Sequence, residues 1–282
     1  MKHIKLTAAL LAVTIVAAGC GGSKSETPQK ETPKTLVLYY SLTNNTKQVA
    51  EEIASLMGAD IERIEAVEPY DTAFQPTIER CMKEREQGVL PQIKPLNADL
   101  SQYEVIFIGY PVWFGTYAPP VVTFLSNSDL SGKKIVPFCT FGSGGLESSV
   151  RDLEAAQPNA EILPGYGVRA ARLEAMPKEV EQFLVAGGFI EGEYFQPEEF
   201  PEQHPVSEEE AAIFDAAVNG YPMLSAKAST VASRPAENGI EYLFTAEQLP
   251  REGAPDMPPM PDVKVYVLAE EGQAPVFTQV VR

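Results

Sequence analysis

The 282-residue sequence contains only two histidines and three cysteines, and this scarcity excludes several kinds of site. Of the histidines, His3 lies in a segment expected to be removed, which leaves His204 and makes histidine catalysis or a histidine metal site untenable. Three cysteines are too few for a disulfide framework. Cys81 and Cys139 fall in a predicted helix and a predicted strand, and two buried thiols are the simpler expectation than a disulfide between them.

Positive charge is also scarce, with 22 Lys and Arg against 39 Asp and Glu and a net charge of −17. An acidic protein is repelled by nucleic acids and by anionic membrane surfaces, so we expect neither as a partner. No Gly-x-Gly-x-x-Gly fingerprint is present, so the loops do not indicate direct use of a nicotinamide dinucleotide. The length allows two domains of roughly 100–150 residues each.

Residues 1–20 predict the signal peptide of a bacterial lipoprotein. Residues 1–5 are basic, and residues 6–18 are apolar but shorter than the roughly 20 residues that span a bilayer. The segment ends in Ala-Ala-Gly-Cys at Cys20, which resembles a lipobox with Ala17 where leucine is more usual. We therefore expect a lipid on Cys20, a place in the cell envelope facing the periplasm or the outside, and no other membrane contact. The alternative is a plain signal peptide with an incidental cysteine.

An apolar run, a hydroxyl-rich turn and a helix form the first candidate site. Residues 35–40 are an uninterrupted β-forming run, typical of a strand buried on both faces of a parallel sheet. Residues 47–57 predict a helix whose apolar face carries Val49, Ile53, Leu56 and Met57. The turn between them, residues 41–46, would present backbone N–H groups and hydroxyls to an anion at the start of the helix. A serine-rich N-cap would explain the same residues.

Two more predicted strands end in distinctive loops. The strand at 104–109 leads into Tyr-Pro-Val-Trp-Phe-Gly-Thr at 110–116, which carries the only tryptophan of the chain. Trp113 is either a stacking partner for a planar ligand or a cap on the sheet. The strand at 134–140 opens into a glycine-rich loop at 141–145, where the backbone must turn sharply or approach something closely. In a doubly wound sheet, such loops meet at the carboxyl ends of the strands, where ligands bind.

Residues 35–190 therefore resemble the flavodoxin family. Residues 41–46 resemble its Ser/Thr-x-Thr-Gly-x-Thr phosphate loop, with Asn44 where glycine is usual, and asparagine tolerates a positive φ well. The Tyr-Pro-x-Trp and Thr-x-Gly-Ser-Gly loops resemble a bacterial branch of this family. The resemblance implies an α/β three-layer sandwich with a five-stranded parallel sheet in the order 2-1-3-4-5, and FMN as the cofactor.

The resemblance also implies a set of FMN-binding residues and no metal ligands. The phosphate would be held by Ser41, Thr43, Asn44, Asn45 and Thr46. One side of the flavin ring would be flanked by Pro111, Val112, Trp113, Phe114 and Gly115. The other side would be flanked by Thr140, Phe141, Gly142, Ser143 and Gly144.

The implied function is electron transfer, or an FMN-dependent oxidation or reduction, with a redox protein or a quinone-like small molecule as partner. The sequence indicates no catalytic acid or base, because Tyr110 and Tyr117 are better explained as packing residues. The Phe114–Gly115 peptide is a candidate to reorient near the flavin. The alternative is a flavin-free interaction protein, in which Asn44 and Phe141 mark a degenerate pocket.

The last part of the chain predicts a separate domain. Residues 21–34 predict a flexible tether, and the proline-rich, acidic residues 191–206 predict a linker. Residues 207–282 predict an α+β domain of one helix and a four-stranded antiparallel sheet, which resembles cystatin-like domains. The inhibitory Gln-x-Val-x-Gly loop of cystatins is absent, so we expect a binding or docking module rather than a protease inhibitor.

Overall fold

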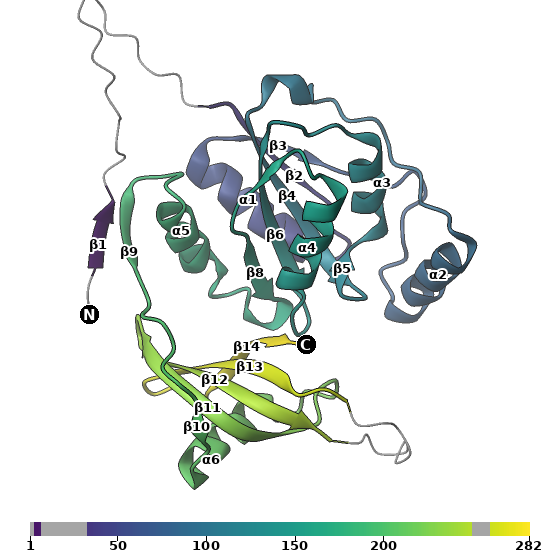
Figure 1. The fold of residues 1–282 in the computed structure, drawn as a ribbon. Coiled ribbons are helices and arrows are strands. Elements are labelled where there is room, and N and C mark those ends of the chain that lie inside the picture. The colour runs from purple at the N-terminus through teal and green to yellow at the C-terminus, as the bar shows by residue number, and fades with distance from the viewer. Residues whose placement is uncertain (1–2, 7–32, 250–259) are drawn as a thin grey trace, which may run out of the picture.

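The computed structural model describes residues 3–6, 33–249 and 260–282. Cys20 and most of the predicted signal peptide and tether lie outside these residues. The chain forms an α/β domain and a smaller C-terminal domain, which packs below the sheet of the first domain in Figure 1. Among the described residues, no helix has the length and apolarity needed to cross a membrane.

The α/β domain is built on a parallel sheet in the strand order β3-β2-β4-β6-β7, with β8 also paired to β6. Counted along the chain, this is the predicted order 2-1-3-4-5, in which β7 and β8 share the fifth place. A short strand, β5, pairs antiparallel with the end of β4. The strands are β2 (Thr35–Tyr39), β3 (Asp60–Arg63), β4 (Val105–Trp113), β5 (Thr116–Tyr117), β6 (Lys134–Phe141), β7 (Glu161–Ile162) and β8 (Tyr166–Arg169).

Helices cover both faces of this sheet, which confirms the three-layer sandwich (Figure 1). They are α1 (Asn45–Met57), α2 (Phe74–Gln87), α3 (Pro119–Asn127), α4 (Leu146–Ala156) and α5 (Met176–Ala186), with short 3₁₀ turns at Leu100–Gln102 and Ala170–Arg172. Proline opens α3, where its missing N–H is not needed and its fixed φ suits a helix start. Gly58 ends α1 with φ 61°, a conformation that favours glycine.

Alternate side chains of each strand enter two separate cores, as expected for a strand buried on both faces. Val37 and Phe107 pack with α1 and α5 on one face. Leu38 and Ile108 pack with α3 and α4 on the other. In α1, Val49 and Ile53 are fully buried, but the prediction for Leu56 was wrong: it is 38% exposed, because the buried stripe runs through Ala50 and Ala54 instead.

Both described cysteines are free and buried, as predicted. Cys81 lies in α2 and Cys139 in β6, and both belong to the core on the α3–α4 face. Burial raises the pKa of the Cys81 thiol to about 11 and raises that of Cys139 further. Both therefore stay protonated at neutral pH and serve as small apolar side chains.

The C-terminal domain holds one helix against an antiparallel sheet in the order β10-β11-β12-β13-β14. Its elements are β10 (His204–Pro205), α6 (Glu208–Val218), β11 (Ala226–Ala236), β12 (Gly239–Gln248), β13 (Val263–Glu270) and β14 (Val276–Val281). The sheet has five strands rather than the predicted four, because the two-residue β10 adds to the edge of β11. A capping box between Ser207 and Glu210 starts α6, and Phe214 anchors the helix in the core.

The predicted linker at 191–206 contains two short strands. One is β10, and the other is β9 (Gly192–Phe195), which pairs antiparallel with β1 (His3–Leu6). Since β1 falls inside the predicted signal peptide, cleavage after residue 19 would remove the partner of β9.

Gly109 lies at the centre of the sheet opposite Phe138, and we expect it to accept no larger residue. A Cβ at position 109 would lie 2.1 Å from Cζ of the fully buried Phe138 ring. Gly109→Ala should therefore lower the free energy of unfolding by about 1–3 kcal/mol through overpacking. Urea unfolding checks this, with Gly220→Ala as a surface control whose cost comes from its positive φ alone. Phe138→Leu should cost less in the Gly109→Ala background than alone; strict additivity would contradict the clash.

Candidate functional site

The loop between β2 and α1 has the geometry of an anion site. Asn44 adopts φ 66° and ψ 2°, a left-handed conformation that asparagine tolerates well. No side chain caps the first turn of α1, and that turn contains no acidic residue. The N–H groups at the positive end of the helix therefore remain available to an anion.

Ser41 is the clearest sign of a missing partner in this loop. Its side chain is 1% exposed, and its Oγ is a buried polar atom without a hydrogen-bond partner. An unpaired buried hydroxyl costs free energy, and native structures retain few of them. The Ser41 carbonyl accepts a hydrogen bond from Arg63 Nη2 at 2.6 Å, so a cation from β3 lies beside the loop. Sequence reasoning missed Arg63, because only the parallel pairing of β2 with β3 places it there.

A buried hydrogen bond joins the first and third predicted loops. The hydroxyls of Thr46 and Thr140 lie 2.8 Å apart, and both side chains are at most 4% exposed. Thr46 opens α1 and Thr140 lies near the end of β6, 94 residues further along the chain. Because β4 lies between β2 and β6 in the sheet, this bond spans the strand from which the second loop leaves.

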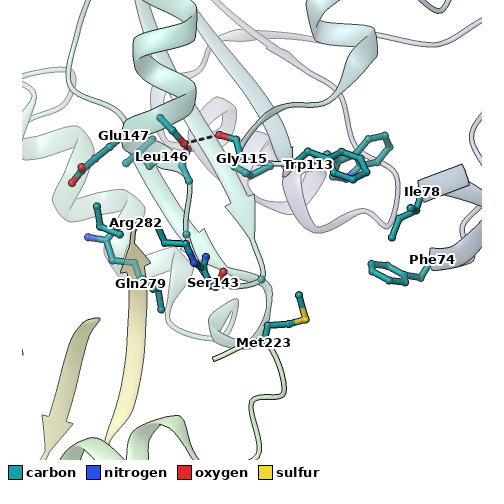
Figure 2. Close-up of a pocket in the computed structure, with 18 of the residues that line it drawn as sticks. Phe74, Ile78, Trp113, Gly115, Ser143, Leu146, Glu147, Met223, Gln279 and Arg282 are labelled. Atoms are coloured by element: carbon teal, nitrogen blue, oxygen red, sulfur yellow. Dashed lines mark hydrogen bonds between the residues drawn. The ribbon is translucent and has the colours of Figure 1, made fainter. Parts of the chain in front are cut away.

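The second loop follows β4 and has a strained backbone. Phe114 has φ 52° and Gly115 has φ 84°, two successive residues in the left-handed region. Phenylalanine rarely adopts this conformation, and such strain is typical of functional loops. The Phe114 side chain is 52% exposed, and the Gly115 carbonyl accepts a hydrogen bond from Ser148 Oγ at 2.6 Å. The second loop is thereby tied to α4, the helix that follows the third loop (Figure 2).

Trp113 is held in place by two tyrosines. Its ring meets Tyr40 edge-on at 5.9 Å and Tyr70 at 5.4 Å between centroids. Tyr70 is fixed in turn, since its hydroxyl donates to Glu84 Oε2 at 2.5 Å and the Arg80 guanidinium stacks 3.8 Å from its ring. Burial, and then the bond to Glu84, raise the pKa of Tyr70, so it stays neutral. Tyr70, Arg80 and Glu84 thus form a fixed support for Trp113.

The third loop divides into a buried and an open part. Phe141 is 4% exposed and packs in the core, and Thr140 bonds to Thr46. Gly142, Ser143 and Gly144 face a cavity instead. The prediction that Phe141 flanks a planar ligand therefore does not fit its position, because alternation along β6 turns this side chain into the core.

The three loops meet around one cavity of about 700 Å³, a size typical of ligand pockets. The predicted residues that line it are Thr43, Val112, Trp113, Phe114, Gly115, Gly142, Ser143 and Gly144. The predicted residues that do not line it are Ser41, Asn44, Asn45, Thr46, Pro111, Thr140 and Phe141. Of these, Ser41, Asn44, Asn45 and Thr46 belong to the anion loop (residues 41–46), and Thr140 supports that loop.

Sequence reasoning missed about two thirds of the residues that line the cavity. The start of α2 contributes Thr72, Ala73, Phe74, Thr77 and Ile78, and the start of α4 contributes residues 145–148 and Arg151. The C-terminal domain contributes Tyr221, Met223 and residues 279–282. No local signal marked these residues, since no pattern in a sequence shows which face of a second domain meets the first.

Glu147 is the carboxylate side chain that lines the cavity, whereas the two tyrosines considered from the sequence, Tyr110 and Tyr117, are packing residues. Tyr110 is fully buried and donates to Ser149 Oγ at 3.1 Å, and Tyr117 is 7% exposed. Burial raises the pKa of Tyr110 and raises that of Tyr117 to about 12, so both act as packing residues. Within the described residues, no cluster of three or more His, Cys, Asp or Glu side chains could hold a metal.

Comparison with known proteins agrees with this geometry. The flavodoxin family model matches residues 34–182, more than half of the 282 residues. The chain belongs to the flavodoxin family. The match covers the α/β domain through most of α5 and leaves the C-terminal domain outside it. No curated protein matches the chain.

Several solved structures are similar to the α/β part of the chain. A putative flavoprotein from Bacteroides eggerthii is 28% identical, with 55% of this chain and 98% of that chain covered and a TM-score of 0.49. A putative flavoprotein from Bacteroides uniformis is 24% identical, with 53% and 98% covered and a TM-score of 0.45. A flavoprotein from Lactobacillus acidophilus, crystallised in complex with FMN, is 25% identical, with 48% and 93% covered and a TM-score of 0.45.

The Thr46–Thr140 bond predicts that a double variant is more stable than either single variant. Thr46→Val or Thr140→Val alone leaves one buried hydroxyl unpaired and should lower the free energy of unfolding by about 1–3 kcal/mol. The double variant replaces both hydroxyls with methyl groups and should recover most of that loss. Chemical denaturation in the absence of ligand checks this. A double variant as unstable as the sum of the singles would show that the two hydroxyls are not coupled.

Proposed function

We propose that this protein binds FMN in the loop cavity and acts as a redox protein of the cell envelope. FMN is the cofactor of the flavodoxin family, to which the chain belongs. The observation that carries the proposal is the unpartnered Ser41 Oγ in an anion loop that opens beside an apolar cavity. A phosphate at one end and a planar ring at the other match these two parts of the site.

The residues present fit FMN in chemistry as well as in position. Ser41 and Thr43, with the N–H groups at the start of α1, would hold the phosphate. The left-handed Asn44 allows the same turn that glycine makes in the family motif. Trp113 and Phe114 on one side, with Gly142 and Ser143 on the other, would flank the ring. Thr46 is already bonded to Thr140, so its hydroxyl would act mainly by holding the loop.

FMN supplies electron and hydride transfer when it is bound, and the protein supplies binding, orientation and electrostatics. The Phe114–Gly115 peptide is the candidate to adjust near the ring, since both residues are already in the left-handed region. The hydrogen bond from Ser148 to the Gly115 carbonyl would set which way this peptide points.

The envelope location and the role of the C-terminal domain are part of the proposal. The sequence at Cys20 supports a lipid anchor, and residues 21–34 would connect it to the folded chain. One helix on an antiparallel sheet supports the cystatin-like description of the C-terminal domain. The partner would be a redox protein or a quinone-like small molecule.

FMN titration tests the cofactor assignment, because Trp113 is the only tryptophan and lies in the cavity. FMN should quench its fluorescence at a saturating, one-to-one ratio. Ser41→Ala should weaken FMN binding by about 10- to 100-fold, the usual worth of a hydrogen bond to a charged group. The same variant should be at least as stable as the parent without FMN, because it removes an unpaired buried hydroxyl. Ser126→Ala, at an exposed position in α3, is the matched control.

Two results would count against this account. If FMN does not quench Trp113, the flavin-free interaction protein is the better reading. If Ser41→Ala destabilises the free protein and leaves FMN affinity unchanged, Ser41 is a structural residue and the phosphate lies elsewhere.

The anchor is tested separately by fractionation of bacteria that express the full chain. The parent protein should sediment with membranes and partition into detergent. Cys20→Ala should lose the lipid and no longer partition into detergent, with Cys81→Ala as the control that stays in the membrane fraction. An unchanged distribution for Cys20→Ala would rule out the lipoprotein assignment.

A further inference from the structure

The C-terminal domain is joined to the third loop at short range. The Val280 N–H in β14 donates to the Ser143 carbonyl at 2.6 Å. Gly144 permits this approach, because a Cβ at that position would lie 2.1 Å from the Val280 carbonyl oxygen. The glycine-rich loop, which is predicted to flank a flavin, is therefore also the surface against which the C-terminal domain packs.

Arg169 forms hydrogen bonds to both domains at the same junction. Its Nε donates to the Gly142 carbonyl at 2.9 Å, and its Nη1 donates to the Phe277 carbonyl at 2.8 Å. The guanidinium carbon lies 3.4 Å from the centre of the Phe277 ring and 5.4 Å from that of Tyr221. At 9% exposure, this arginine is nearly buried between the two domains. The domains are thus held in one arrangement at the cavity.

This arrangement gives the cavity an outer wall of apolar side chains. Tyr221 and Met223 line it from the C-terminal domain, next to the polar Gln279 and the charged Arg282, and Phe74 and Ile78 line it from α2. Figure 2 shows Phe74, Ile78 and Met223 lying around the same space, with Trp113 beyond them. Phe74 is 77% exposed and Met223 is 50% exposed, although both are apolar. Exposed apolar side chains from separate elements that gather at one cavity are typical of a binding site.

The outer wall comes from α2 and the C-terminal domain, and not from the two loops that would flank a flavin ring. A ring between Trp113 and Ser143 would use those loops, and it would leave Phe74 and Met223 without a partner. We propose that the C-terminal domain forms a binding site for a second planar, apolar small molecule, next to the flavin. This inference rests on the proposed function and names the partner class for the same site.

The shape of the site favours a small molecule over a redox protein. The lining residues of both domains surround one cavity of about 700 Å³, a space of ligand size that the second molecule would share with the flavin. A docked protein needs a surface of about 800 Å² on each partner. The walls are mostly apolar and aromatic, with Glu147, Arg151 and Arg282 as the charged lining residues, and such walls favour a flat ring.

Binding of 1,4-naphthoquinone to the oxidised, FMN-loaded full chain tests the proposal without any turnover. Isothermal titration calorimetry should show one site. Met223→Arg should weaken naphthoquinone binding by at least about tenfold, because it places a charge in an apolar wall. The same variant should leave FMN affinity, measured by Trp113 fluorescence, within about twofold. Ile240→Arg is the matched control, since Ile240 is 44% exposed in the same domain and does not line the cavity.

Three results would overturn the proposal. The first is no naphthoquinone binding to the FMN-loaded parent. The second is an equal loss of FMN affinity in Met223→Arg, which would make the wall part of the flavin site. The third is binding of a basic redox protein such as cytochrome c, abolished by Met223→Arg, in place of naphthoquinone. If FMN itself fails to bind, the naphthoquinone titration is repeated on the flavin-free chain. Naphthoquinone binding that Met223→Arg weakens would support the second site although the cofactor assignment fails. No naphthoquinone binding would overturn both proposals.

Discussion

The site depends on one constraint, the adjacency of β2, β4 and β6 in a parallel sheet. Parallel strands end at the same edge, so the loops that follow these three strands must meet, although they lie far apart in the sequence. The Thr46–Thr140 hydrogen bond directly connects the start of α1 with the end of β6. The anion loop, the loop at 110–116 and the glycine-rich loop lie close together because the strands before them are neighbours in the sheet.

The same edge of the sheet also positions the second domain. Gly144 and Arg169 fix β14 against the glycine-rich loop, and this contact turns an open flavodoxin-type site into a cavity with two walls. A movement of the C-terminal domain would therefore displace Gly142 and Ser143, which lie next to the flavin position. The surface ion pair between Lys178 and Glu237, at 3.0 Å, adds little to this junction because both side chains are partly exposed.

Much of the fold could be predicted from the sequence, because local patterns and strand order determine it. The apolar runs at β2, β4 and β6, the proline that opens α3 and the capping box of α6 are all local signals. The left-handed conformation of Asn44 followed from its place in a recognisable loop motif. The short β10 and the exposed Leu56 could not be predicted, since edge pairing and the exact helix face depend on neighbouring elements.

The site was only partly predictable for the same reason. Residues within the three motifs could be named, but the inward turn of Phe141 depends on the register of β6. Arg63 reaches Ser41 only through strand pairing, and Met223 reaches the cavity only through the docking of the second domain. These contacts are tertiary, and no spacing along the chain encodes them.

Hydrogen–deuterium exchange with and without FMN tests most directly whether the three loops form one flavin site. The account predicts slower exchange in peptides that cover residues 41–47, 111–116 and 140–145, all at the same FMN concentration, and no change in β12. Protection of only one of these loops, or of none, would contradict it.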